Sequence, residues 1–162
     1  MAKVARAAYV ASRQRVEAIT ASKTITSAET GELYLVDQSA GSVVITLPAR
    51  QEGAYFKFLI GTELTDFNAK SIIIQAAGSG TANGEMVGSC AIIISAGNPT
   101  MGGDQVATTG NGHPQFIIES THAADDLYAG SQVEVYCNGT AWIVRAELRT
   151  TNARLVGKFQ GS

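Results

Sequence analysis

Alternation between two faces is the main pattern of apolar residues in this chain, and two runs, 42–47 and 55–60, show it most clearly. Successive side chains of a β-strand point to opposite sides, so each run offers one face to a core. Pro48 lacks the N–H that a ladder needs and ends the first strand. The residues expected to face the core are Val43, Ile45 and Leu47 in the first run and Phe56, Phe58 and Ile60 in the second.

The same kind of pattern predicts further strands, separated by turn-forming pairs such as Asn83-Gly84 and Gly102-Gly103. In ELYLVD, Leu33 and Leu35 share a face, and we expect Leu35 in the core. SIIIQA and AIIISA are apolar throughout their centres, so we expect the core to cover one side and a partner the other. The further strands are predicted at 32–37, 71–76, 91–96, 115–120, 132–137 and 141–148.

The sharpest hairpin signal is QVEVYCNGTAWIV (132–144), in which Asn138-Gly139 is typical of a type I′ turn. Trp142 is the one tryptophan of the chain, and a large aromatic ring at this place is expected to pack in the core. The inward residues of this hairpin are expected to be Val133, Val135, Cys137, Trp142 and Val144.

Many short strands with little helix between them predict an all-β fold, an antiparallel β-sandwich or barrel that is jelly-roll-like or β-tulip-like. Irregular spacing of the strands argues against a solenoid or propeller. The length of 162 residues fits one domain, which we place at 16–162 behind an N-terminal arm at 1–15. We expect its core to contain Leu35, Ile45, Leu47, Phe56, Phe58, Val135 and Trp142.

The first 15 residues carry basic side chains and no acidic one. One interpretation is a frayed terminus. The other is an arm that becomes ordered against an acidic surface of a neighbouring subunit. On the second interpretation the interface residues are Lys3, Arg6, Arg13 and Arg15.

The charge of the chain narrows the list of partners. Charged residues make up 16%, against about 25% in typical domains, and the net charge is −2. A nucleic-acid binder would show a basic field, and no apolar run approaches the ~20 residues of a membrane span, so we expect neither nucleic acid nor membrane as a partner. We expect Cys90 and Cys137 to pack as buried thiols, although a disulfide between them stays open.

No recognisable catalytic motif stands out. His122 lies near Asp125 and Asp126, but this spacing matches no established metal motif, and His113 lies in a turn. A glycosidase pair among the carboxylates is conceivable but unmarked. We therefore expect no enzyme activity, no cofactor and no bound metal. The carboxylates weighed for such a pair are Asp104, Glu119, Asp125 and Asp126.

The order of motifs from residue 19 to 145 resembles the β-rich structural modules of tailed bacteriophages. A threonine-rich lead and strand pair, ITASKTITSAETGELYLVDQSAGSVVITLPA (19–49), is followed by GAYFKFLI (53–60), SIIIQAAG (71–78) and a closing GSQVEVYCNGTAWIV (130–144). Among these modules, the chain most resembles head decoration, or cement, proteins. These motifs distinguish poorly between one position in the virion and another.

The resemblance implies a structural protein on the outer capsid surface of a virion, with the major capsid protein and its own copies, as a homotrimer, for partners. The alternative it leaves open is a receptor- or glycan-binding module of a tail fibre or spike. Aromatic side chains stack on sugars, and Tyr55 and Tyr128 are the candidates for that second role.

Overall fold

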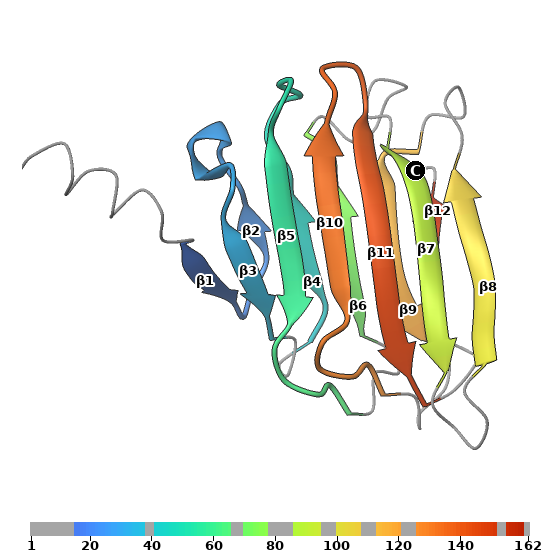
Figure 1. Ribbon diagram of the computed structural model, residues 1–162. Coiled ribbons are helices and arrows are strands. Elements are labelled where there is room, and N and C mark those ends of the chain that lie inside the picture. The colour runs from blue at the N-terminus through green and yellow to red at the C-terminus, as the bar shows by residue number, and fades with distance from the viewer. Residues whose placement is uncertain are drawn as a thin grey trace, which may run out of the picture.

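The structure, a computed structural model, describes residues 15–37, 41–65, 70–77, 86–94, 100–107, 113–120, 126–151 and 155–160. Within these residues the chain forms two facing sheets, so the prediction of an all-β sandwich is confirmed (Figure 1). No helix in the described ranges is long and apolar enough to span a membrane. The elements are β1 (Val16–Ile19), β2 (Lys23–Thr24), the 3₁₀ turn η1 (Ser27–Glu29), β3 (Leu33–Val36), β4 (Val43–Thr46), β5 (Tyr55–Ile60), β6 (Ser71–Gln75), β7 (Met86–Ile94), β8 (Thr100–Ala107), β9 (Gln115–Ser120), β10 (Gln132–Cys137), β11 (Trp142–Thr150) and β12 (Leu155–Gln160).

The seven-stranded sheet has the order β1-β3-β5-β10-β11-β7-β8, and the five-stranded sheet has the order β12-β9-β6-β4-β2. All eight strands predicted from the sequence are present. The prediction did not include β1, β2, β8 and β12. These four are the outermost strands of the two sheets, where a strand needs less apolar sequence to be held.

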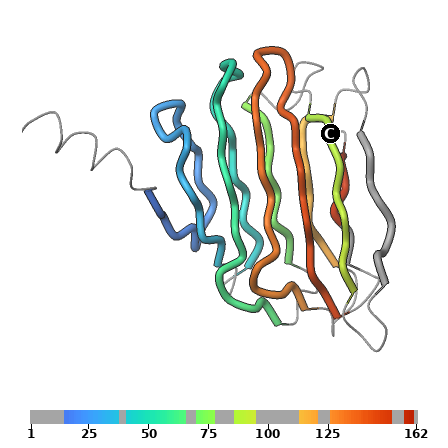
Figure 2. The backbone as a smooth tube through the Cα atoms, in the orientation of Figure 1, coloured from blue at the N-terminus to red at the C-terminus, as the bar shows by residue number. Residues whose placement is uncertain are grey.

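Both sheets are mixed, which corrects the expectation of purely antiparallel pairing. The first six strands alternate between the sheets, so β1, β3 and β5 are parallel neighbours in one sheet and β2, β4 and β6 in the other. A chain that crosses to the opposite sheet after every strand returns to each sheet in its original direction. Figure 2 shows this winding, in which the chain passes from one sheet to the other after each of these strands. The starts of β1, β3 and β5, at Val16, Leu33 and Tyr55, are unevenly spaced, so the sequence shows no regular period.

The core lies between the sheets. The inward rings contact one another: Phe56 lies 5.9 Å from Trp142, and Tyr34 stacks on Phe58 at 5.4 Å between ring centroids. Burying such rings stabilises the fold by roughly 1.5–3 kcal/mol each. Six of the seven predicted core residues are confirmed as buried, namely Ile45, Leu47, Phe56, Phe58, Val135 and Trp142.

The seventh, Leu35, is a correction. Leu35 is half-buried on the outer face of β3, where it pairs with Leu59 of β5, and the buried residues of this strand are Tyr34 and Val36. Every position of β3 is apolar, so alternation alone does not choose the inward face. The parallel register decides it by placing Tyr34 opposite Phe58.

The hairpin between β10 and β11 has its predicted faces, but its turn differs from the predicted one. Asn138 forms the closing pair with Ala141, since the Asn138 N–H donates to the Ala141 carbonyl at 3.2 Å. Gly139 and Thr140 are therefore the two central residues, and Gly139 has a positive φ of 89°. The Asn138 side chain accepts hydrogen bonds from the backbone N–H groups of Thr140 and Ala141, at 3.0 and 2.8 Å.

Two glycines mark places where strands or sheets approach closely. Gly88 in β7 has a φ of +144°, and a Cβ there would lie 1.8 Å from the Val144 carbonyl oxygen of β11. A Cβ on Gly157 in β12 would lie 2.5 Å from the Sγ of Cys90 across the sandwich. Cys90 and Cys137 are both buried free thiols, as expected.

Candidate functional site

The outer face of the seven-stranded sheet carries a row of apolar side chains, here called the aromatic row: Tyr55, Tyr136, Ile143 and Val87. Strand register builds it, because Tyr136 of β10 pairs with Tyr55 of β5 and with Ile143 of β11, which pairs with Val87 of β7. Tyr136 is 44% exposed and Ile143 is 37% exposed. Isolated exposed apolar residues are ordinary, but a row across four strands forms a contiguous surface suited to docking.

A charged row runs beside the aromatic row on the same face. Lys57, Glu134 and Arg145 are paired in register across β5, β10 and β11, and their charges alternate in sign. The Lys57 ammonium lies 3.2 Å from a Glu134 carboxylate oxygen. Burial, together with the charge of Glu134 and a hydrogen bond to it, raises the pKa of Tyr55. The aromatic row therefore lies against a charged border that is largely neutralised.

The outer face of the five-stranded sheet has a different character. An uncharged polar ladder crosses all five strands, and its three central members are joined by hydrogen bonds from Gln75 to Thr46 at 2.9 Å and from Gln115 to Gln75 at 3.3 Å. Its register members are Thr24, Thr46, Gln75, Gln115 and Gln160. The large apolar side chains that are exposed among the described residues, Val16, Tyr136 and Ile143, all belong to the seven-stranded sheet, so the polar face is the weaker candidate for apolar docking.

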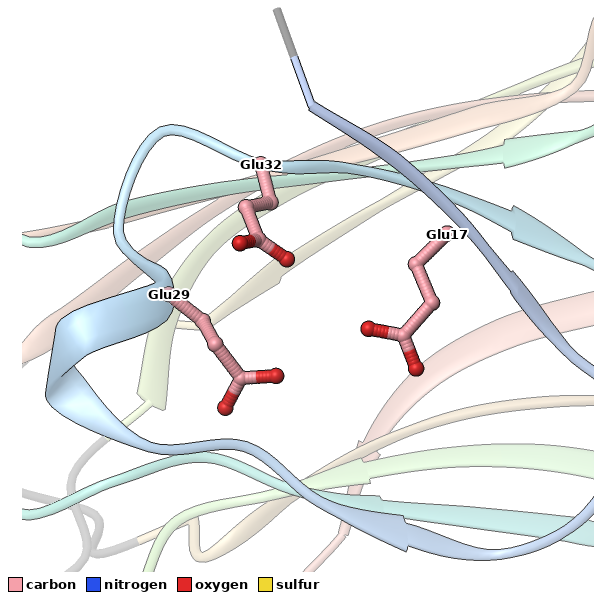
Figure 3. A group of neighbouring side chains, drawn as sticks. All are labelled: Glu17, Glu29 and Glu32. Atoms are coloured by element: carbon pink, nitrogen blue, oxygen red, sulfur yellow. The ribbon is translucent and has the colours of Figure 1, made fainter.

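Three carboxylates, Glu17, Glu29 and Glu32, gather at the N-terminal corner of the sandwich, with oxygens within 4.8 Å of one another (Figure 3). Each of the three carboxylates already forms an ion pair with a protein cation. The Lys23 ammonium lies 2.6 Å from Glu17 and 2.7 Å from Glu29, and the Arg15 guanidinium lies 2.8 Å from Oε1 of the buried Glu32. That last contact is a close ion pair without the alignment of a hydrogen bond. The cluster is therefore a structural ion-pair network.

The predicted interface residues divide into two groups. Lys3, Arg6 and Arg13 lie outside the described residues. Arg15 is part of the sandwich edge: besides its ion pair with Glu32, its carbonyl accepts a hydrogen bond from the N–H of Leu33 at 2.9 Å. The structured domain therefore includes Arg15.

The catalytic and metal candidates from the sequence are not brought together in the described part of the chain. His122 and Asp125 lie outside it, and so does the side chain of Asp104. Glu119 forms an ion pair with Lys158 on the outer face of the five-stranded sheet. His113 packs near Phe159, with ring centroids 6.2 Å apart.

Tyr128, one of the two sugar-stacking candidates, lines a groove with a cavity volume of about 620 Å³. Ile93 and Ala129 supply an apolar floor, and Glu63 and Arg149 bring charge. The Arg149 guanidinium is held 2.9 Å from Glu147, and the Arg149 carbonyl accepts the N–H of Tyr128 at 2.9 Å. The other candidate, Tyr55, belongs to the aromatic row.

The sequence contains a signal for the aromatic row that the prediction did not use. Tyr136 alternates with the inward Val135 and Cys137, so it must face outward, and the hairpin turn places it opposite Ile143. Val87 could not be predicted as part of the row, because its strand pairs with β11, which is distant in the sequence.

Comparisons of the chain with protein-family models, with curated proteins and with solved structures found no match. The function is therefore argued from the residues and their geometry.

Proposed function

We propose that this protein is a structural virion protein, a capsid decoration or cement protein that binds the outer surface of a phage head. The observation that carries the proposal is the aromatic row, whose two central side chains, Tyr136 and Ile143, remain exposed on a face bordered by paired charges. Burying apolar surface against a partner contributes roughly 25 cal/mol per Å². The resemblance of residues 19–145 to phage β-modules supplies the partner, the major capsid protein.

The mechanism follows from the thermodynamic linkage between binding and the stability of the capsid lattice. A protein that binds only the assembled, expanded lattice stabilises that state by its binding free energy. A homotrimer placed at a local three-fold position presents three copies of the aromatic row, so individually weak contacts combine. Because the row lies on the regular strands of a sheet, little conformational entropy is lost when it docks.

Substitution of the row tests the proposal. The double variant Tyr136→Lys/Ile143→Lys places two charges where apolar contact is needed, and we expect it to fold but to bind stripped phage heads at least tenfold more weakly. Co-sedimentation with the heads measures binding, and circular dichroism checks the fold. Thr24→Lys, an exposed change on the opposite sheet, is the control. Equal binding by the double variant and the control contradicts docking through this face.

The number of copies per particle tests the position in the virion. Decoration of the head requires hundreds of copies in purified particles, whereas a tail appendage is present in a handful. Quantitative mass spectrometry against the major capsid protein measures the ratio. A handful of copies overturns decoration.

The groove at Tyr128 favours one second function, a glycan-binding module of a tail fibre or spike. It combines an aromatic ring with a carboxylate and a guanidinium, which suit the faces and hydroxyls of a sugar. On a glycan array, Tyr128→Ala would abolish binding on this alternative, while Tyr136→Ala would leave it intact. An array without any bound glycan removes the alternative.

A further inference from the structure

The groove beside Tyr128 opens on the outer face of the seven-stranded sheet. Arg149 of β11 pairs in register with Ile93 of β7, and both alternate with buried neighbours, so their side chains point outward. Tyr128 follows the fully buried Leu127, which is bridged to Thr150 of β11, so Tyr128 points outward as well. These side chains meet in what we call the Tyr128 groove, whose lining residues are Glu63, Ile93, Tyr128, Ala129 and Arg149.

A β-turn that is fixed on both sides forms one wall of the groove. Residues 128–131 make this turn, and its first carbonyl accepts the N–H of its last residue at 3.1 Å. Gly130, the third residue, has a φ of +87°, as a type II turn requires. The Gly130 N–H donates to the Ile60 carbonyl of β5, and the Arg149 N–H donates to the Ser131 hydroxyl, both at 2.9 Å. The wall is thus preformed, so little conformational entropy is lost when a ligand binds.

The Arg149 guanidinium is held beside this turn with part of its hydrogen-bonding capacity unused. Its Nε and Nη2 donate to a Glu147 carboxylate oxygen at 3.3 and 2.9 Å. Its other terminal nitrogen, Nη1, lies on the side of Gly130, where a Cβ would be 3.8 Å from it. Within the described ranges, the side-chain acceptor of this guanidinium is Glu147. The Nη1 N–H groups are therefore donors that a ligand can use.

Glu63 supplies the opposite chemistry. It is exposed, it lines the same groove, and in the part of the chain that the structure describes its carboxylate has no ion pair. A carboxylate only accepts hydrogen bonds and a guanidinium only donates them. A ligand that satisfies both must offer a donor and an acceptor side by side, next to an apolar face. The neighbouring hydroxyls of a pyranose do so, and its C–H face packs on an aromatic ring.

The charges around the groove distinguish a neutral sugar from an acidic one. The carboxylates of Glu63 and Glu147 outnumber the one guanidinium, that of Arg149. A carboxylate on the ligand would be repelled by Glu63 and would compete with Glu147 for the guanidinium. We propose, on the basis of the glycan-binding function considered for this groove, that it binds a neutral hexose. Neighbouring hydroxyls bridge Glu63 and Nη1 of Arg149, and the C–H face of the sugar lies on Tyr128.

Titration of ¹⁵N-labelled protein with single sugars tests this class of ligand. The probes are the methyl glycosides of glucose, galactose and mannose, and the corresponding sodium uronates are the acidic counterparts. The backbone N–H peaks of Ala129 and Gly130 report binding at the groove. We expect both peaks to shift saturably with at least one neutral glycoside, and its uronate to bind at least about tenfold more weakly.

The titration separates failure of the sugar class from failure of glycan binding. A uronate that binds as tightly as its neutral counterpart, or more tightly, overturns the neutral class and leaves a glycan site standing. The absence of any shift overturns the proposal, and the glycan array then decides whether the protein binds glycans at all. Decoration of the phage head is tested by co-sedimentation and does not depend on either result.

Substitution of Glu63 tests the origin of the selectivity. Glu63→Gln removes the charge that repels acids, so we expect the neutral glycoside to bind more weakly and its uronate more tightly. Glu52→Gln is the matched control: Glu52 is also an exposed glutamate, but it lies beside Gly139 in the turn before β11, away from the groove. We expect the control to leave both affinities unchanged. A preference for the neutral sugar that is the same in Glu63→Gln as in wild type overturns the role of this carboxylate.

Discussion

Glu29 is held in its charged state by its neighbours. Burial alone would raise its pKa, but the Lys23 ammonium and hydrogen bonds from Thr26 more than offset this and lower the pKa to about 2. The Thr26 hydroxyl donates to the carboxylate at 2.7 Å and its backbone N–H at 2.5 Å. Lys23 responds in the opposite direction: burial lowers its pKa, yet the hydrogen bonds to Glu17 and Glu29 leave it raised.

This carboxylate predicts a pH dependence of stability. A group whose pKa is depressed in the folded state stabilises the fold above its ordinary pKa, here 4.5, and loses that contribution as pH falls toward about 2. Near neutral pH, we expect Glu29→Gln to unfold at a lower urea concentration than wild type. Between pH 4.5 and about 2, we expect the free energy of unfolding to fall less in Glu29→Gln than in wild type. Urea titrations at several pH values measure the free energy of unfolding of each variant, and Glu63→Gln, a change at an exposed residue, is the control. Parallel curves for Glu29→Gln and wild type contradict the assignment.

At the scale of single elements, alternation predicts a strand's inward face only when its two faces differ. In β5 the inward Phe56, Phe58 and Ile60 alternate with the outward Tyr55, Lys57 and Leu59, and the predicted inward face is confirmed. In β3 both faces are apolar, and the predicted inward face was wrong. The pairing with β5, and not the alternation within β3, selects the face that is buried. The same limit explains the missed site residues: outward Tyr136 could be found from its own hairpin, whereas Val87 depends on a distant strand.

The confirmed face of β5 carries a stability prediction. Phe58 is 2% exposed and stacks on Tyr34, so Phe58→Ala leaves a cavity and should destabilise by about 3–5 kcal/mol. Leu59→Ala, the next residue on the half-buried outer face, should cost less than half as much. Chemical denaturation of both variants measures the contrast, and equal losses would mean that the two faces are packed alike.

The parallel pair β7–β11 depends on a glycine. At Gly88 any side chain meets both a φ that L residues rarely adopt and the Val144 carbonyl, so Gly88→Ala should destabilise by at least roughly 2 kcal/mol. Gly61→Ala is the matched control, since its nearest neighbour, Leu35, is at an ordinary 3.6 Å. Thermal unfolding compares the two, and a Gly88→Ala midpoint equal to that of the control refutes the close approach.

At the scale of the whole molecule, the class of fold follows from strand patterns, but the order of strands does not. Local alternation reports that a segment is extended and half-buried, and it carries no information about which strand lies beside it. The β10–β11 hairpin was accessible because its pairing is local. The coiled winding of β1 to β6 was not, because each of its pairings joins segments separated by a strand of the other sheet.

The basic N-terminal segment is where stability and docking can be separated. Arg15 pairs with the buried Glu32, so the folded domain includes it. A chain without residues 1–14 should keep its stability to within about 0.5 kcal/mol, yet bind phage heads more weakly if Lys3, Arg6 and Arg13 contact the capsid. The Arg15→Ala variant should do the reverse. Loss of the guanidinium leaves Glu32 buried without its counter-ion, a cost of roughly 1–3 kcal/mol, while the remaining basic residues still bind. Denaturation and co-sedimentation of both variants measure the two effects. Unchanged binding by the truncated chain would exclude the segment from docking.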